Sequence, residues 1–151
     1  MISSEIIAKL RLDTGAGVMD CKKSLEESSG DYEKAKKILA LNAQAIAKKK
    51  ADRVAKQGLI ECFVHGGKIG VILEINCETD FVARNDEFKN LAHNIAMQIA
   101  SMNPQNIEEL LNENYIRDES LTIKQLLEQT IAKIGENIQV KRFERFEMGE
   151  E

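Results

Sequence analysis

The sequence of 151 residues has few of the features on which membrane insertion, disulfide bonding and catalysis commonly depend. It contains no tryptophan, one proline, two histidines and three cysteines. No apolar run approaches the roughly 20 residues that cross a bilayer, and the first residues lack a basic stretch followed by an apolar one. We therefore expect a cytoplasmic protein that is neither inserted in a membrane nor exported by the secretory route.

The cysteines and histidines do not form a recognisable reactive pattern. Cys21, Cys62 and Cys77 are odd in number and have no CxxC spacing, which favours a reducing compartment and thiols that act mostly as small buried apolar groups. A zinc site or a Cys–His pair could be drawn from Cys62, Cys77 and His65, but alternation along residues 71–77 turns Cys77 towards the core. We expect no catalytic residue, no metal and no cofactor.

Two glycine-containing segments could suggest nucleotide binding, but neither fits. Residues 15–17 and residues 66–67 lack the length and the lysine of a phosphate-binding loop. We therefore expect no direct binding of a nucleotide.

Charge is unevenly distributed along the chain. Residues 1–57 hold 12 basic and 8 acidic residues, a formal charge of +4, whereas residues 58–151 hold 9 basic and 17 acidic residues, a formal charge of −8. This asymmetry indicates two modules in different surroundings, or a partner that binds in one orientation.

Residues 1–41 are predicted to form a module of three short helices. Ser3 or Ser4 suits the N-cap of the first helix, whose apolar residues recur at successive turns, and Asp31 suits the N-cap of the third. Gly15 and Gly17 permit a sharp turn between the first helix and the second. The module is close to the lower size limit for independent folding.

Residues 42–57 are predicted to form a helical linker, because they are rich in alanine and lysine but offer little to bury. The lysines at 48–50 could form a patch for RNA or for an acidic protein. Three lysines without interleaved aromatic residues favour a hydrated helix surface instead, so no nucleic-acid partner is expected.

Residues 58–151 are predicted to form an α+β core domain. Two runs rich in β-branched residues, 59–64 and 69–75, flank a glycine pair and indicate a hairpin. Apolar residues at helical spacing then follow Asn85, a suitable N-cap. Further helices are expected from 106 to about 112 and from Ser120 or Thr122 to 134, and a third strand over 138–143. Together these elements predict a small three-stranded antiparallel sheet packed on helices.

The segment 76–85 joins the second strand to the long helix and contains a phenylalanine among polar neighbours. Reasoning from the residues alone favours a buried Phe81 that closes the edge of the core. The alternative is an exposed ring that enters a pocket on a partner, as interface hot spots do.

Three segments resemble signatures of one family. Residues 10–25, residues 76–85 with their central TDFV, and residues 133–138 (KIGENI) resemble, in the same order, three signatures of bacterial elongation factor Ts. The resemblance implies a nucleotide exchange factor for the GTPase elongation factor Tu, and not an enzyme. It also implies a ubiquitin-associated-like three-helix module followed by a core domain.

The resemblance further assigns roles to residues. It implies that one set contacts the GTPase domain of the partner: Arg11, Val18 and Met19. It implies that a second set disturbs the magnesium ion bound to the partner: Thr79, Asp80, Phe81 and Val82. Phe81 would wedge between helices of the partner, and Asp80 would help to hold the displaced arrangement.

Two expectations concern parts that differ among family members. Longer members continue past the KIGENI-like segment into a second core subdomain, a coiled coil and a C-terminal helix, whereas this chain ends at Glu151. Short members pair two copies through their sheets, and an unpaired strand near residues 138–146 would offer such an edge, so a homodimer is a hypothesis. The alternatives are a protein-binding or RNA-binding adaptor without exchange activity and, last, a thiol enzyme that uses Cys62 or Cys77.

Overall fold

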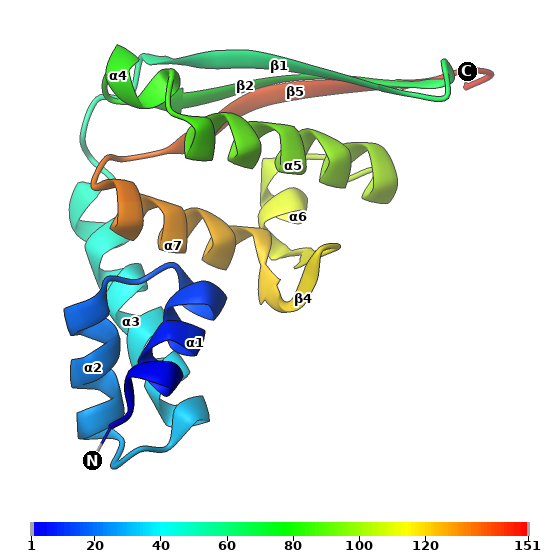
Figure 1. Cartoon of the computed structure of the whole chain (residues 1–151). Coiled ribbons are helices and arrows are strands. Elements are labelled where there is room, and N and C mark those ends of the chain that lie inside the picture. The colour runs from blue at the N-terminus through cyan, green and yellow to red at the C-terminus, as the bar shows by residue number, and fades with distance from the viewer. Residues whose placement is uncertain (1, 151) are drawn as a thin grey trace. The chain divides into compact units, whose positions relative to one another are not determined.

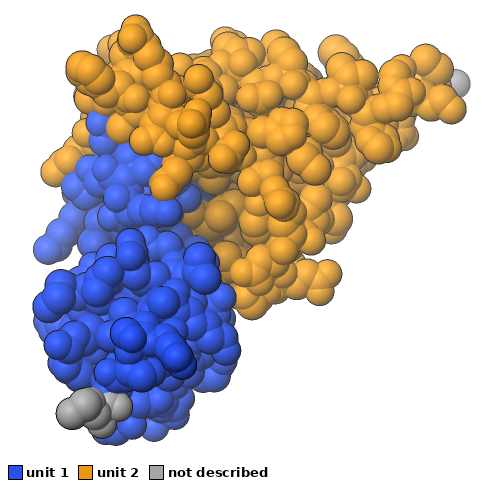
Figure 2. Space-filling model, in the orientation of Figure 1, with its two compact units in different colours: residues 1–51, 127–136 blue, residues 52–126, 137–151 orange. Residues whose placement is uncertain are grey.

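A computed structural model describes residues 2–150 (Figure 1). The chain divides into two compact units, coloured separately in Figure 2. Unit 1 comprises residues 1–51 and 127–136, and unit 2 comprises residues 52–126 and 137–151. No helix in residues 2–150 is both long enough and apolar enough to cross a membrane.

Unit 1 begins with the three predicted helices, which are α1 (Ser4–Thr14), α2 (Val18–Glu27) and α3 (Tyr32–Lys50). Their ends follow the predicted signals. The Ser3 hydroxyl accepts a hydrogen bond from the Ile6 amide, and the Asp31 carboxylate accepts one from the Lys34 amide. Gly15 takes a left-handed conformation and its amide donates to the Arg11 carbonyl, which ends α1.

One hydrophobic core holds these three helices together. Each helix contributes apolar side chains, and the thiol of Cys21 is fully buried among them. The buried members are Leu10, Cys21, Leu25, Ala35 and Leu39. Burial raises the pKa of the Cys21 thiol, so this cysteine serves as the small apolar group that the sequence predicts.

The linker differs from the expectation in two respects. α3 continues without a break to Lys50, so the helical part of segment 42–57 is the C-terminal part of α3 and not a separate helix. Ala43 and Ala47 are also buried, although little burial was expected here, because alanine is small enough for close packing on a helix face. The domain boundaries after residues 41 and 57 stay a prediction.

Unit 2 contains the predicted hairpin and the returning strand. β1 (Gln57–His65) pairs with β2 (Ile69–Cys77), and β5 (Gln139–Glu147) pairs with the other side of β2, all antiparallel. The hairpin turns at the predicted glycine pair, where Gly66 and Gly67 both have positive φ. Gly58 has a φ of 138°, and a Cβ there would lie 2.1 Å from the Ile75 carbonyl oxygen, so the close approach of β1 and β2 requires glycine.

The long helix α5 (Asp86–Met102) packs against β1 and β2 (Figure 1). Its side chains at helical spacing are buried, and the alternate residues Val71, Leu73 and Ile75 of β2 are buried too. The other alternate residues leave apolar groups exposed, among them Ile60, Val64, Ile72 and Phe146. The α+β class, with three N-terminal helices and a three-stranded antiparallel sheet packed on helices, is confirmed.

The region after α5 differs in part from the prediction. α6 (Ile107–Asn112) and α7 (Ile123–Ile134) are the expected helices, but a two-stranded sheet of β3 (Asn114–Tyr115) and β4 (Asp118–Thr122) lies between them in the chain. The start of α7 at Ser120 is therefore wrong, and the alternative start at Thr122 lies one residue before the observed start at Ile123. The Thr122 hydroxyl accepts from the Gln125 amide, and the Gln125 side chain accepts from the Thr122 amide.

Candidate functional site

The segment with the exposed phenylalanine forms a very short helix, α4 (Asp80–Ala83). The Thr79 hydroxyl caps it by accepting a hydrogen bond from the Val82 amide at 3.3 Å. Ala83 is buried, whereas the side chain of Phe81 is 89% exposed. The expectation of a buried Phe81 is therefore wrong, and the alternative of an exposed ring is the observed one. A single helical turn can bury only one side, and here Ala83 occupies it.

Charged and polar groups surround this ring on α4. Asp80 is exposed and forms an ion pair with Arg84 one turn later. Thr79 and Val82 are half-buried. The thiol of buried Cys77 donates to the Thr79 carbonyl at 3.2 Å, which fixes the entry to the helix. The four residues TDFV thus lie together and present one apolar ring next to one carboxylate.

The second candidate region lies on α1 and α2 in unit 1. Met19 is 71% exposed and Val18 46% exposed, both in the first turn of α2. Arg11 lies at the end of α1, and its Nε donates to the Ala16 carbonyl at 3.4 Å. Leu12 is as exposed as Phe81 and was not predicted as a contact residue. Leu12 does not follow the helical spacing of the inward-facing α1 residues Ile6, Ile7 and Leu10. This mismatch is the feature of the sequence from which its exposure could have been predicted.

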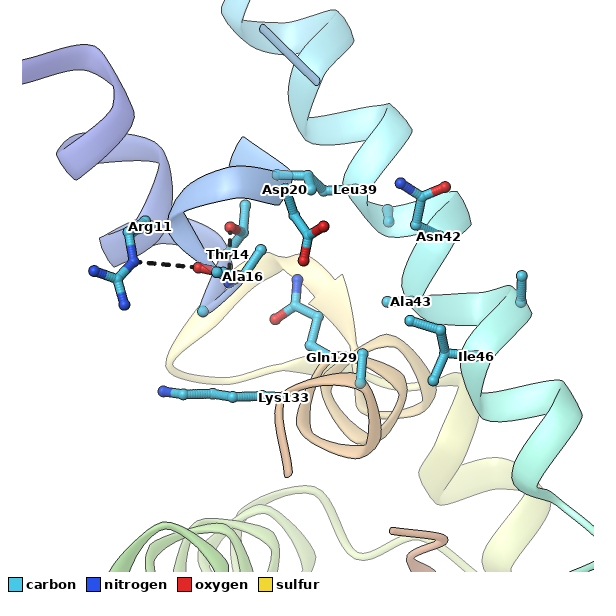
Figure 3. Close-up of a pocket in the computed structure, with 15 residues that line it drawn as sticks. Arg11, Thr14, Ala16, Asp20, Leu39, Asn42, Ala43, Ile46, Gln129 and Lys133 are labelled. Carbon is cyan, nitrogen blue, oxygen red and sulfur yellow. Dashed lines mark hydrogen bonds between the residues drawn. The ribbon is translucent and has the colours of Figure 1, made fainter. Parts of the chain in front are cut away.

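Unit 1 also contains a hollow of about 600 Å³ beside these residues (Figure 3). Residues of three segments line it: the region from the end of α1 to the start of α2, the middle of α3 and the C-terminal part of α7. Its lining combines the charged side chains of Arg11, Asp20 and Lys133 with small apolar side chains such as Ala43. Arg11 therefore belongs both to the wall of this hollow and to the exposed surface of α1.

The thiols and imidazoles do not form a reactive cluster in the described residues. Among residues 2–150, no three His, Cys, Asp or Glu side chains lie where they could share a metal ion. Cys77 is fully buried, as alternation predicted, but Cys62 is exposed, so the expectation that the thiols are mostly buried holds for two of the three. His93 lies 3.8 Å from the Glu61 carboxylate and edge-on to Phe63.

The candidate regions thus consist of exposed apolar side chains beside charged groups, on short helices held by caps and buried neighbours. Such surfaces bind other proteins, because removing the apolar area from water is the main favourable contribution to association. The fold and these regions therefore have the character of a protein-binding surface and not of an active-site cleft.

Comparison with known proteins identifies the family. The family model described as elongation factor TS matches residues 78–151. Elongation factor Ts from Thermoanaerobacter sp. (strain X514) is 44% identical to the chain, with 99% of this chain and 96% of that protein covered. The chloroplastic elongation factor Ts of Rhodomonas salina is 43% identical, with 99% and 90% covered. The chain belongs to the elongation factor Ts family, whose members are exchange factors of translation elongation and not enzymes.

The comparisons also show where this chain differs in length. The alignment with the Thermoanaerobacter protein has 196 positions, at least 45 more than the 151 residues of the chain. Because 99% of the chain is aligned, the alignment gaps in this chain are internal and not at its ends. A Nostoc elongation factor Ts is 50% identical over 146 residues, and there the match covers 96% of this chain and 46% of the relative.

Proposed function

We propose that this chain is a guanine nucleotide exchange factor that binds elongation factor Tu with GDP bound and promotes release of the GDP. Membership of the elongation factor Ts family, at 44% identity over 99% of the chain, is the observation that carries this proposal. The exposed aromatic ring on α4 supports it, because an exchange factor needs a group that can enter its partner.

The activity requires only binding energy. An exchange factor binds the nucleotide-free partner more tightly than the GDP-bound partner, and linkage then requires that GDP binds less tightly when the factor is present. The factor therefore speeds dissociation without forming or breaking a covalent bond. We accordingly assign it no catalytic residue, no cofactor and no nucleotide site of its own.

We assign the displacement step to α4 and its cap, residues 79–82. The ring of Phe81 would enter between helices of elongation factor Tu and shift the groups that organise the magnesium ion and the phosphates. The carboxylate of Asp80 would help to hold the shifted arrangement. Thr79 and Val82 would fix the helical turn, since the Thr79 hydroxyl accepts from the Val82 amide.

We assign the first contact with the partner to unit 1. Arg11, Val18 and Met19 would bind the GTPase domain, and we add Leu12 because it follows Arg11 in the chain and is 89% exposed. The three helices around one core support the proposal that residues 1–41 form a ubiquitin-associated-like module. We propose that the activity is cytoplasmic, whereas the Rhodomonas relative is chloroplastic.

We also propose that two copies pair through their sheets. In the described residues β1 and β5 are the edges of the three-stranded sheet, and apolar side chains of all three strands are exposed on one face. Analytical sedimentation at micromolar concentration should give the mass of a dimer, and Ile72→Asp, at the middle of that face, should give a monomer. A wild-type monomer would contradict the pairing.

The exchange activity is tested by GDP release. Elongation factor Tu is loaded with a fluorescent GDP and mixed with excess unlabelled GDP and increasing concentrations of this protein. The wild type should raise the release rate to a plateau, and Phe81→Ala should lower that plateau by about 100-fold, the order of a hot-spot side chain. Met19→Ala should instead raise the half-saturating concentration.

A matched control separates the ring from a general effect of apolar surface. Leu41 is 64% exposed on α3 and has no assigned role, so Leu41→Ala should keep both the plateau and the half-saturating concentration. Tight binding without faster GDP release would support the adaptor hypothesis and contradict exchange. An unchanged plateau for Phe81→Ala would contradict the role of Phe81 as a wedge but not the exchange activity itself.

A further inference from the structure

One signature-like segment, residues 133–138, has no role in the function proposed above. Its last part follows the end of α7, where Gly135 has a φ of 86° and its amide donates to the Ile131 carbonyl. The turn leads the chain to Asn137, whose side chain is polar and yet only 2% exposed. A buried amide of this kind requires hydrogen-bond partners, and these partners show what the segment does.

The partners of Asn137 come from two distant parts of unit 2. Its side-chain Nδ2 donates to the Arg53 carbonyl at 2.8 Å, and its backbone amide donates to the Glu78 carboxylate at 3.0 Å. The same Glu78 oxygen lies 3.7 Å from the Arg53 guanidinium. The Glu78 side chain is 19% exposed, so its bond to Asn137 is largely shielded from water. We call Arg53, Glu78 and Asn137 the polar clamp.

The position of Glu78 in the chain gives the clamp its importance. Glu78 directly precedes Thr79, the N-cap of α4, and follows the last residue of β2. A helix of four residues is too short to be stable without its surroundings. Because the Phe81 ring is exposed, packing does not orient it, and its direction depends on the backbone of α4. Buried Ala83 holds the end of the helix, and the clamp holds the residue before its cap.

We propose that Asn137 is a positioning residue that, through Glu78, holds α4 in the conformation that presents Phe81 to the partner. The inference rests on the proposed function for its consequence in exchange, but the positioning itself is a property of the free protein. A pre-ordered α4 has less conformational entropy to lose when the ring enters the partner, so a looser α4 would insert it less effectively.

Hydrogen exchange of the free protein tests the positioning directly. The Val82, Ala83 and Arg84 amides are bonded within α4 and its cap, and the Ile95 amide of buried α5 reports unfolding of the core. Asn137→Ala removes the side-chain hydrogen bond to the Arg53 carbonyl, which holds the Asn137 backbone amide against Glu78. It should speed exchange of the α4 amides about tenfold relative to Ile95, the order expected for losing a hydrogen bond. Equal acceleration of both groups, or none in α4, would overturn the proposal.

Two further variants separate positioning from loss of stability. Gln98→Ala removes another fully buried amide of unit 2, which bonds Asn114 and Ile116 but no residue of the clamp or of α4. It should leave the ratio of α4 exchange to Ile95 exchange unchanged. Glu78→Gln keeps an acceptor for the Asn137 backbone amide and should stay within about twofold of the wild type. Glu78→Ala removes that acceptor and should speed exchange of the α4 amides at least as much as Asn137→Ala does. Equal effects of Glu78→Gln and Glu78→Ala would overturn the role of this hydrogen bond.

The release assay then tests the consequence. Asn137→Ala should lower the plateau rate about tenfold with little change in the half-saturating concentration, and it should add nothing in a Phe81→Ala background. A further loss in that background would show that Asn137 does not act through Phe81. If hydrogen exchange changes as expected but Phe81→Ala releases GDP normally, the clamp is supported and the wedge is contradicted. If hydrogen exchange of the α4 amides is unchanged in Asn137→Ala while Phe81→Ala slows GDP release, the wedge is supported and the clamp is contradicted.

Discussion

α4 and α5 are neighbours in the chain, and each contains one phenylalanine, but the two rings have opposite surroundings. Phe81 on the four-residue α4 is 89% exposed, whereas Phe88 on the seventeen-residue α5 is fully buried. α5 has one side packed along β1 and β2, so its apolar residues at helical spacing all enter the core. The comparison shows that the position of a phenylalanine on its helix, relative to the face that packs on the core, determines whether the ring is buried or exposed.

The largest expected effect comes from making the same substitution at both positions. Phe88→Ala should lower the free energy of unfolding by about 3–5 kcal/mol, because it leaves a cavity under α5. Phe81→Ala should change it by less than about 0.5 kcal/mol, because the ring contributes little to the core. Urea denaturation followed by circular dichroism measures both. A comparable loss at the two positions would contradict the difference in burial.

The same contrast explains which features the sequence could predict. The caps at Ser3, Asp31 and Asn85 were predicted because a cap depends on residues within one turn. The α5 helix was predicted because its apolar pattern extends over several turns. The exposure of Phe81 was not, because one turn is too short to show a pattern.

Features that depend on distant residues could not be predicted. β3 has only two residues, and Gln98 of α5 anchors this region through bonds to Asn114 and Ile116. The bond from Asn137 to the Arg53 carbonyl joins residues 84 positions apart. For the candidate site, the resemblance predicted residues 79–82. The hydrogen bonds that hold α4 in place could be seen only in the structure.

The two helix caps provide a second test of the comparison. Asn85 caps α5 by accepting from the Glu87 amide at 2.7 Å, and Thr79 caps α4 by accepting from the Val82 amide. Asn85→Ala should lower the global free energy of unfolding by about 0.5–2 kcal/mol, because α5 belongs to the core. Thr79→Ala should mainly speed hydrogen exchange of the α4 amides, because a single turn can open locally. Equal losses of global stability would show that α4 unfolds together with the core.

The smallest expected effect concerns the carboxyl group of Glu113, which follows α6 in the chain and bonds Gln98 of α5. Glu113 accepts a hydrogen bond from Gln98 Nε2 at 3.2 Å, but burial dominates and raises its pKa above the usual 4.5. A carboxyl whose pKa is raised on folding stabilises the protein below 4.5, and this contribution is lost as pH rises through the folded-state pKa. Above that pH the ionised group is costly to keep partly buried.

Glu113→Gln removes this cost and retains a carbonyl oxygen that can accept from Gln98. The variant should therefore be more stable than the wild type at pH 7 by less than about 1 kcal/mol, because solvent partly screens the charge. The advantage should disappear below about pH 4, where Glu113 is protonated in both the folded and the unfolded protein. Urea denaturation of both proteins at a series of pH values measures the difference. A difference independent of pH would show that packing of the side chain, and not its ionisation, sets the effect.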